Sequence, residues 1–120
     1  MERNWDTIRE ILGEVEKLPP DSSLSLKDFD EGRAHEVSYQ VVLLAEAGLV
    51  DASLSKSIGT GPTHFVLRRL TWSGHDFLDA IRDEKLWHKT KVRIAEHGGA
   101  MTYELVKTVA VSLAKSALGI

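Results

Sequence analysis

The chain has 120 residues, no cysteine and a formal net charge of −3. This length suits a single domain over residues 1–120 with a modest core, and the lack of cysteine excludes disulfides, a thiol nucleophile and Cys-ligated zinc. The negative charge also excludes the uniformly basic profile that is typical of a strong nucleic-acid binder.

Charge is distributed unevenly along the chain. Residues 1–31 carry nine acidic and four basic side chains, whereas residues 32–70 carry three acidic and four basic ones. The first segment would repel phosphates and the second would tolerate them. The N-terminal residues lack the apolar core of a signal peptide, and no apolar run approaches the roughly 20 residues of a membrane span. We therefore expect a cytoplasmic protein that does not enter a membrane.

The first predicted helix covers residues 5–18. Its apolar side chains recur at helical spacing, Asn4 is placed to cap it, and Pro19–Pro20 end it. Apolar and polar residues then alternate over 24–26, which predicts a short strand followed by a loop or a single turn.

Residues 33–47 predict the second helix, with a buried stripe that includes Val37, Val41 and Leu44. Gly48 follows at the position where a helix often ends in a residue of positive φ.

Two strands follow, over residues 49–55 and 64–70. The Gly- and Pro-containing segment 59–62 predicts the turn between them. Together they form a long hairpin, which is the candidate wing.

Three helices complete the predicted order. The first runs to Ile81 and is capped by Thr71 or Ser73. The second extends from about residue 84 to residue 96 and buries Trp87, Thr90 and Ile94. The last, residues 102–118, has apolar residues on more than one side, which predicts a homodimer through this helix.

Two blocks of sequence resemble known families. LLAEAGLV at Leu43–Val50 resembles the end of the recognition helix in the arsenic-repressor and multiple-antibiotic-repressor families, and LTWSGHDFLDAI at Leu70–Ile81 resembles the exit from their wing. With RNWDTIREIL near the start, the extended block LTWSGHDFLDAIRDEKLW and the final helix, nearly the whole chain resembles a small family of uncharacterised bacterial and phage proteins, known as a domain of unknown function. The resemblance implies a bacterial or phage cytosolic protein and no particular activity.

The sequence departs from a standard winged-helix regulator in one respect. Only about 14 residues separate Leu18 from Arg33, so the helix that normally precedes the recognition helix is short or missing. The sequence therefore does not predict the usual helix-turn-helix docking on DNA.

Polar side chains at the front of helix 33–47 are the candidates for reading bases in the major groove. Basic side chains on the hairpin are the candidates for contacting phosphates. The predicted DNA-binding residues are Arg33, His35, Ser38, Tyr39, Gln40, Lys56, Arg68 and Arg69. The alternative is an ordinary solvated helix face with surface charges on the strands.

Other motifs indicate no chemistry. Lys85, Lys89 and Arg93 line one helix face, which is either solvated or a second surface for phosphates or an acidic partner. Pairs of histidine and carboxylate supply two ligands each, fewer than a zinc site uses. Ser73, His75 and Asp76 stand too close together for a catalytic relay. We expect no metal, no cofactor and no enzymatic activity.

Trp72, at the exit from the hairpin, has two interpretations. It either covers the edge of the core or belongs to an exposed interface, where tryptophan is enriched.

The sequence as a whole predicts an α+β, winged-helix-like domain with a small antiparallel sheet. Its core covers about residues 1–83, and a helical extension covers about 84–120. The first functional hypothesis is a DNA-binding transcriptional regulator that uses helix 33–47 and hairpin 49–70 on double-stranded DNA. The alternative is a protein-interaction module without DNA binding, such as a phage factor that binds a host protein. Fold alone does not decide between them.

Overall fold

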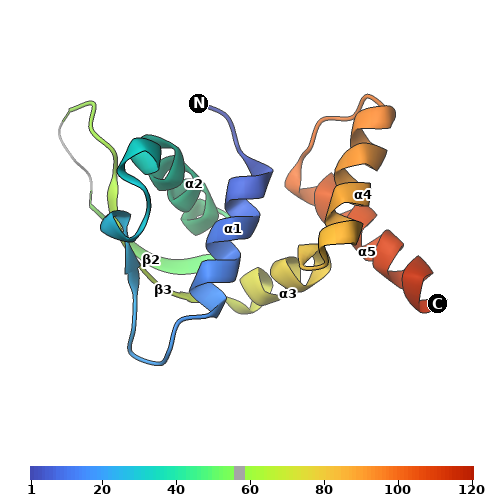
Figure 1. The fold of residues 1–120 in the computed structure, drawn as a ribbon, viewed down its shortest axis with the longest axis horizontal. Coiled ribbons are helices and arrows are strands. Elements are labelled where there is room, and N and C mark those ends of the chain that lie inside the picture. The colour runs from blue at the N-terminus through green and yellow to red at the C-terminus, as the bar shows by residue number, and fades with distance from the viewer. Residues whose placement is uncertain (56–58) are drawn as a thin grey trace. The chain divides into compact units, whose positions relative to one another are not determined.

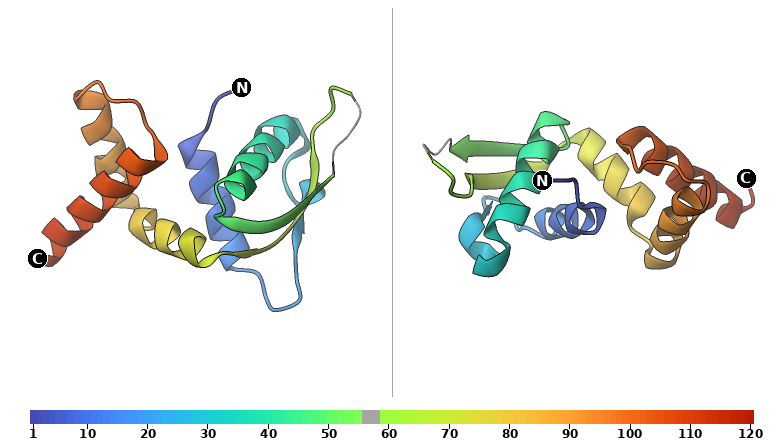
Figure 2. Two further views of the ribbon diagram at one scale, coloured as in Figure 1. Left: turned by 180° about the vertical axis from the view of Figure 1, so that it is seen from behind. Right: turned by 90° about the horizontal axis from the view of Figure 1, so that it is seen from above.

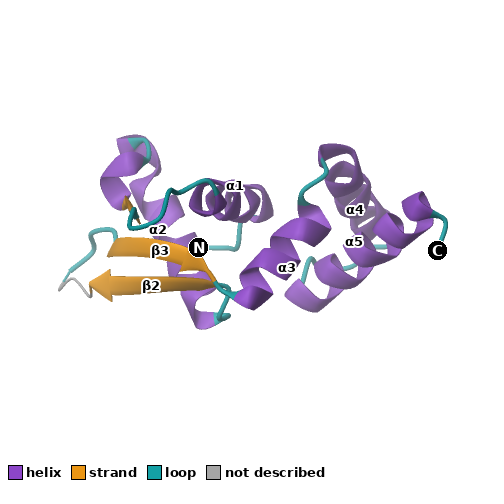
Figure 3. Cartoon of the chain, turned by 90° about the horizontal axis from the view of Figure 1, so that it is seen from below, coloured by secondary structure: helices purple, strands orange, loops and turns teal. Residues whose placement is uncertain are grey.

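The computed structural model describes residues 1–55 and 59–120. The chain divides into two compact units, Met1–His75 and Asp76–Ile120. The first holds two helices and a three-stranded antiparallel sheet, and the second is helical (Figures 1 and 3). The predicted α+β class is therefore confirmed. Among the described residues, no helix is both long and apolar enough to cross a membrane.

Helix α1, Trp5–Glu16, begins where the sequence predicts. The Asn4 side chain accepts a hydrogen bond from the Thr7 amide at 3.1 Å, which satisfies one of the free amides of the first turn. The apolar stripe is fully buried and comprises Ile8, Ile11, Leu12 and Val15.

The connection to the next helix contains no α-helix. Strand β1, Leu24–Ser25, is followed by two single 3₁₀ turns, Leu26–Asp28 and Glu31–Arg33. Asp28 closes the first turn by accepting a hydrogen bond from the Ser25 amide at 2.7 Å. The expectation that a helix is missing here is confirmed.

Helix α2, Ala34–Glu46, is followed as predicted by Gly48, whose φ of 73° suits a residue without Cβ. Strands β2, Val50–Ser55, and β3, His64–Leu70, then form the predicted hairpin. The sheet order is β1-β3-β2. Figure 2 shows α1 and α2 beside this hairpin, and both helices contact β3. Buried β3 residues alternate with exposed ones from His64 to Arg68 because only one face of the sheet is covered.

Helix α3, Trp72–Ile81, is capped by Thr71 rather than Ser73. The Thr71 hydroxyl accepts a hydrogen bond from the Gly74 amide at 3.0 Å and donates one to the Gly48 carbonyl at 2.6 Å. Gly74 is required here because a Cβ at this position would lie 2.0 Å from the Leu49 carbonyl oxygen. The start of α3 is thereby fixed against the end of α2.

The second unit is built from the rest of α3 and two further helices, α4, Glu84–Glu96, and α5, Tyr103–Leu118. Phe77 of α3 stacks on Tyr103 of α5, with ring centroids 4.9 Å apart. The three residues that the sequence predicts to be buried in α4 are buried: Trp87, Thr90 and Ile94. Gly98, with φ of 66°, ends α4.

Candidate functional site

Arg33, the first predicted DNA-binding residue, forms an ion pair within the chain. Its guanidinium donates two hydrogen bonds to the Glu10 carboxylate of α1, at 3.0 and 2.8 Å. Glu36 lies 3.7 Å from the same guanidinium. The Arg33 hydrogen bond lowers the pKa of Glu10, and the same contact raises the pKa of Arg33. The positive charge is therefore balanced by two carboxylates.

Ser38 and Gln40 are buried, with 4% and 1% of their surface exposed. The Ser38 hydroxyl donates to the His35 carbonyl at 3.2 Å. The Gln40 amide accepts from the Asn4 backbone amide at 2.9 Å and donates to the Glu2 carbonyl at 3.0 Å. Both side chains are thus occupied inside the first unit, and in this conformation neither reaches a base edge.

His35 and Tyr39 are the two α2 candidates that retain accessible side chains. They stand four residues apart and so share one helix face, with His35 exposed and Tyr39 half-buried. Of the five candidates in residues 33–47, these two remain for contact with a ligand.

Arg68 and Arg69 both lie on the surface because β3 contains a bulge. The register changes between Asp51 and Ala52, so two consecutive arginines oppose the single Asp51 of β2. Each guanidinium lies 3.7 Å from the Asp51 carboxylate, and Arg68 also donates to the Ser53 hydroxyl. The third hairpin candidate, Lys56, lies outside the described residues.

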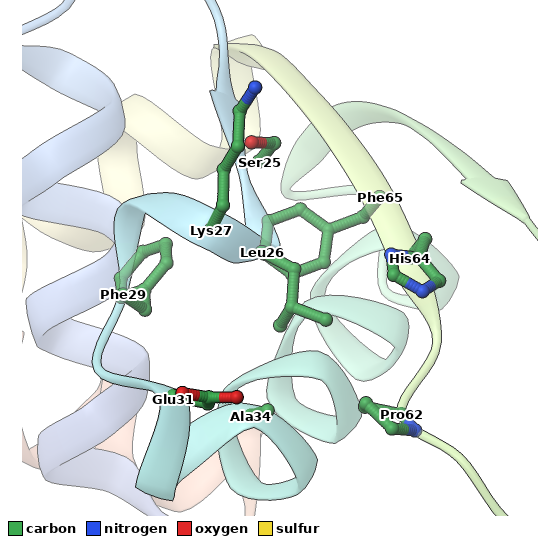
Figure 4. Close-up of a pocket in the computed structure, with 9 residues that line it drawn as sticks. All are labelled: Ser25, Leu26, Lys27, Phe29, Glu31, Ala34, Pro62, His64 and Phe65. Atoms are coloured by element: carbon green, nitrogen blue, oxygen red, sulfur yellow. The ribbon is translucent and has the colours of Figure 1, made fainter.

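A pocket of about 530 Å³ lies between the first 3₁₀ turn, the start of α2 and the start of β3 (Figure 4). Phe29 and Phe65 line it, with ring centroids 6.2 Å apart. Its charged or titratable lining side chains are Lys27, Glu31 and His64. In Figure 4 these three side chains stand apart around the rim, so they do not form a catalytic cluster.

A second hollow, about 360 Å³, lies at the other end of the sheet. It is formed by the end of α1, the turn around Pro20, the end of β3 and His75. Arg68 and Arg69 line it on one side. No signal in the sequence predicts this hollow, because it depends on where the turn after α1 meets the bulge.

Trp72 is 83% exposed and lies in the chain between Leu70 and His75, two residues that line this hollow. The interpretation that it covers the edge of the core is therefore wrong, and Trp72 stands on the surface. Tryptophan side chains are buried on average, so the exposure of Trp72 indicates a surface that contacts a ligand or partner.

Metal ligands do not cluster in residues 1–55 and 59–120. In that part of the chain, no group of three or more His, Cys, Asp or Glu side chains is arranged to hold a metal ion. Ser73 and His75 are exposed residues of the α3 start, and Asp76 belongs to the second unit.

The chain matches, over residues 2–100, a family described as hypothetical protein, DUF2513. An uncharacterized protein of Haemophilus influenzae (strain ATCC 51907 / DSM 11121 / KW20 / Rd) is 35% identical over 114 residues, covering 94% of this chain and 95% of the relative. The chain belongs to the DUF2513 family. No solved structure matches it.

Family membership confirms the resemblance to a domain of unknown function. The matched residues include the first unit from residue 2 onward, α3 and α4, so Trp72, Lys85, Lys89 and Arg93 all lie inside the DUF2513 region. We therefore use the exposed side chains of the first unit, α3 and α4 to infer what the chain binds.

Proposed function

We propose that the chain is a protein-interaction module without enzymatic activity, and that it binds its partner through a surface centred on Trp72. The observation that carries this proposal is the 83% exposure of Trp72. Tryptophan contributes large contact area at low conformational cost and is enriched among the residues that dominate interface energies. We define the Trp72 surface as Trp72 together with four residues of the hollow whose lining flanks it in the chain, Arg68, Arg69, His75 and Pro20.

The backbone that carries Trp72 is anchored at two neighbouring residues. The hydrogen bond from Thr71 to the Gly48 carbonyl and the close approach of Gly74 to Leu49 anchor the first turn of α3 on both sides of it. A side chain on a rigid element loses less entropy when it binds, which favours its use as an anchor.

The charges of the Trp72 surface indicate the kind of partner. Arg68 and Arg69 contact Asp51 only at 3.7 Å, and both are well exposed. Ion pairs of this kind are weak in water, so a partner carboxylate would compete with Asp51 for the guanidinium groups. We therefore propose a partner protein that presents an apolar pocket for the indole with acidic groups beside it.

The test compares wild-type protein with Trp72→Ala and, as a matched control, Val66→Ala, which shortens an exposed apolar side chain of β3. A partner is captured from a bacterial lysate, purified, and titrated against each variant by calorimetry. We expect Trp72→Ala to weaken binding about 30-fold or more, as for a truncated hot-spot residue, and Val66→Ala to leave it unchanged. Equal affinity of Trp72→Ala and wild type would contradict the proposal.

Tryptophan fluorescence gives an independent readout. Trp87 is buried, whereas Trp72 is exposed to water. Binding of the purified partner should shift the emission to shorter wavelength as the indole leaves water. Trp72→Phe should remove this shift while retaining part of the affinity.

The second candidate function is a DNA-binding transcriptional regulator that uses residues 33–47 and 49–70. It is favoured by the order α1, β1, α2, hairpin, and by the exposed position of His35 on α2. The internal pairing of Arg33 and the burial of Gln40 weigh against it. Under this hypothesis Arg68→Ala/Arg69→Ala removes about two phosphate contacts. In a gel-shift titration, the affinity of this variant should therefore depend less steeply on salt concentration than that of wild type. A wild-type protein that shifts no duplex at low salt would rule it out.

A homodimer through 102–118 fits either function. Only Val106 and Ala110 of α5 are fully buried, whereas Leu118 and Ile120 are largely exposed. A second copy covering this end of α5 would remove those side chains from water.

A further inference from the structure

Helix α4 presents an exposed basic face. The helix carries four basic and two acidic side chains, and its buried residues all lie on the opposite side. Lys85, Lys89 and Arg93 are exposed and recur every four residues. We call these three residues the α4 basic face.

The α4 basic face differs from the three arginines that the sequence predicts to bind DNA. Arg33, Arg68 and Arg69 each lie within 3.7 Å of a carboxylate. Within the residues that the structure describes, none of the three α4 groups forms an ion pair. Glu96 follows Arg93 on the same side of the helix, and Glu84 stands at its start, so the face retains a net positive charge.

This arrangement does not stabilise the helix. Like charges four residues apart repel one another, so both steps of the stripe destabilise α4. Lys85 also lies in the first turn, at the positive end of the helix dipole. The positive charges of the α4 basic face therefore oppose folding, and we interpret them as the binding site of an anionic ligand.

We propose that α4 binds the sugar-phosphate backbone of double-stranded DNA, with Lys85, Lys89 and Arg93 each contacting a phosphate. Eight residues of helix span about 12 Å, which corresponds to three or four phosphates along one strand. The α4 residues Trp87 and Thr90 are buried, so neither stacks on bases nor reads them. The contact is therefore independent of sequence.

An acidic protein is a less suitable ligand for this face. Val92 is the only large apolar residue on the exposed side of the described helix, and it is 38% exposed. Protein interfaces use a desolvated apolar centre, whereas phosphate contacts need none. The proposed DNA contact goes beyond the protein-docking function proposed above. The Trp72 surface lies in the first unit and the α4 basic face in the second, so the failure of one proposal would not affect the other.

The test measures fluorescence anisotropy of a labelled DNA duplex at about 50 to 200 mM salt. With three phosphate contacts, the wild-type affinity should fall about 40-fold over this range. Lys85→Ala/Lys89→Ala/Arg93→Ala should abolish measurable binding. The matched control, Lys17→Ala/Lys107→Ala/Lys115→Ala, removes the same charge elsewhere and should bind like wild type. Circular dichroism checks that all three proteins are folded.

Three outcomes would overturn the proposal. Wild-type protein could show no salt-dependent binding, or the α4 variant could bind DNA as tightly as the control. A polyglutamate peptide could bind the Arg68→Ala/Arg69→Ala protein more tightly than the duplex does, which would assign the α4 basic face to an acidic protein. Arg68→Ala/Arg69→Ala separates this site from the hairpin, since it should leave the α4 contact unchanged.

Discussion

Arg33 and Glu10 join the start of α2 to the middle of α1 through two hydrogen bonds of 3.0 and 2.8 Å. Asn4 and Thr7 of the same region donate hydrogen bonds to Glu36, so the contact between the two helices is a polar network. Arg33, which the sequence predicts to bind DNA, thus stabilises the contact between α1 and α2.

Glu10→Gln should lower the free energy of unfolding by about 0.5–1 kcal/mol, because the pair is ideally arranged but a third or more exposed. The Glu10 pKa lies below its ordinary 4.5. The unfolded carboxyl therefore takes up a proton first, and the stabilisation is present above about pH 4.5 and is lost as the pH falls through the folded pKa. Urea denaturation at a series of pH values should show wild type and Glu10→Gln converging in acid. Parallel curves would contradict this.

Gln40→Leu should cost about 1–3 kcal/mol, since it leaves the Glu2 carbonyl and the Asn4 amide without their partner. The N-terminal segment should also become accessible to proteases. His35→Ala, on the exposed side of the same helix, is the control and should change stability by less than about 0.5 kcal/mol. If Gln40→Leu leaves stability unchanged, the fold does not depend on Gln40. That result would favour the prediction that Gln40 contacts DNA bases.

The sequence predicts the elements well because their signals are local. Asn4, Gly48 and the apolar stripe of α4 each act within a few residues of chain, and the structure confirms all three. The DNA-binding prediction for Gln40 rests on residue type alone, whereas the structure places its side chain in the interior of the first unit. Its position, three residues after Val37 and four before Leu44, places it on the buried stripe.

Two other features depend on contacts between distant segments. Thr71 rather than Ser73 caps α3 because Thr71 also reaches the Gly48 carbonyl, which no local pattern reveals. Arg68 and Arg69 share a surface because a bulge sets them both opposite Asp51, whereas simple strand alternation would separate them. The exposure of Trp72 likewise follows from tertiary packing, so the sequence leaves both of its interpretations open.

Gly74→Ala should destabilise the protein by about 3 kcal/mol, because the added Cβ would lie 2.0 Å from a backbone oxygen, which cannot rotate away. Gly13→Ala is the matched control. It lies inside α1, and a methyl group added there would meet no heavy atom within 4 Å, so it should stabilise the protein by about 0.5–1 kcal/mol. Thermal denaturation of both variants tests the pair. A tolerated Gly74→Ala would show that α3 does not start against Leu49.

Lys89→Glu should raise stability and weaken DNA binding together. The change replaces two repulsive steps, to Lys85 and Arg93, with two attractive ones, which is worth about 0.5–1 kcal/mol. Denaturation measures the free energy of unfolding and anisotropy measures the affinity for DNA, both on the same preparation. Lys89→Gln should lie between wild type and Lys89→Glu in both quantities. A loss of stability in Lys89→Glu would mean that Lys89 makes a structural contact and that the basic face does not oppose folding.

Leu118→Glu/Ile120→Glu should convert a homodimer to a monomer. These side chains are 75% and 82% exposed, so the substitutions should leave the fold of the single chain intact while placing charges in a second copy's contact surface. Light scattering coupled to size exclusion should give twice 13.3 kDa for wild type and 13.3 kDa for the variant. The control Ser73→Glu adds charge at an exposed position of α3 without removing apolar surface and should remain dimeric. A monomeric wild type would reject the homodimer and leave the exposed end of α5 to another partner.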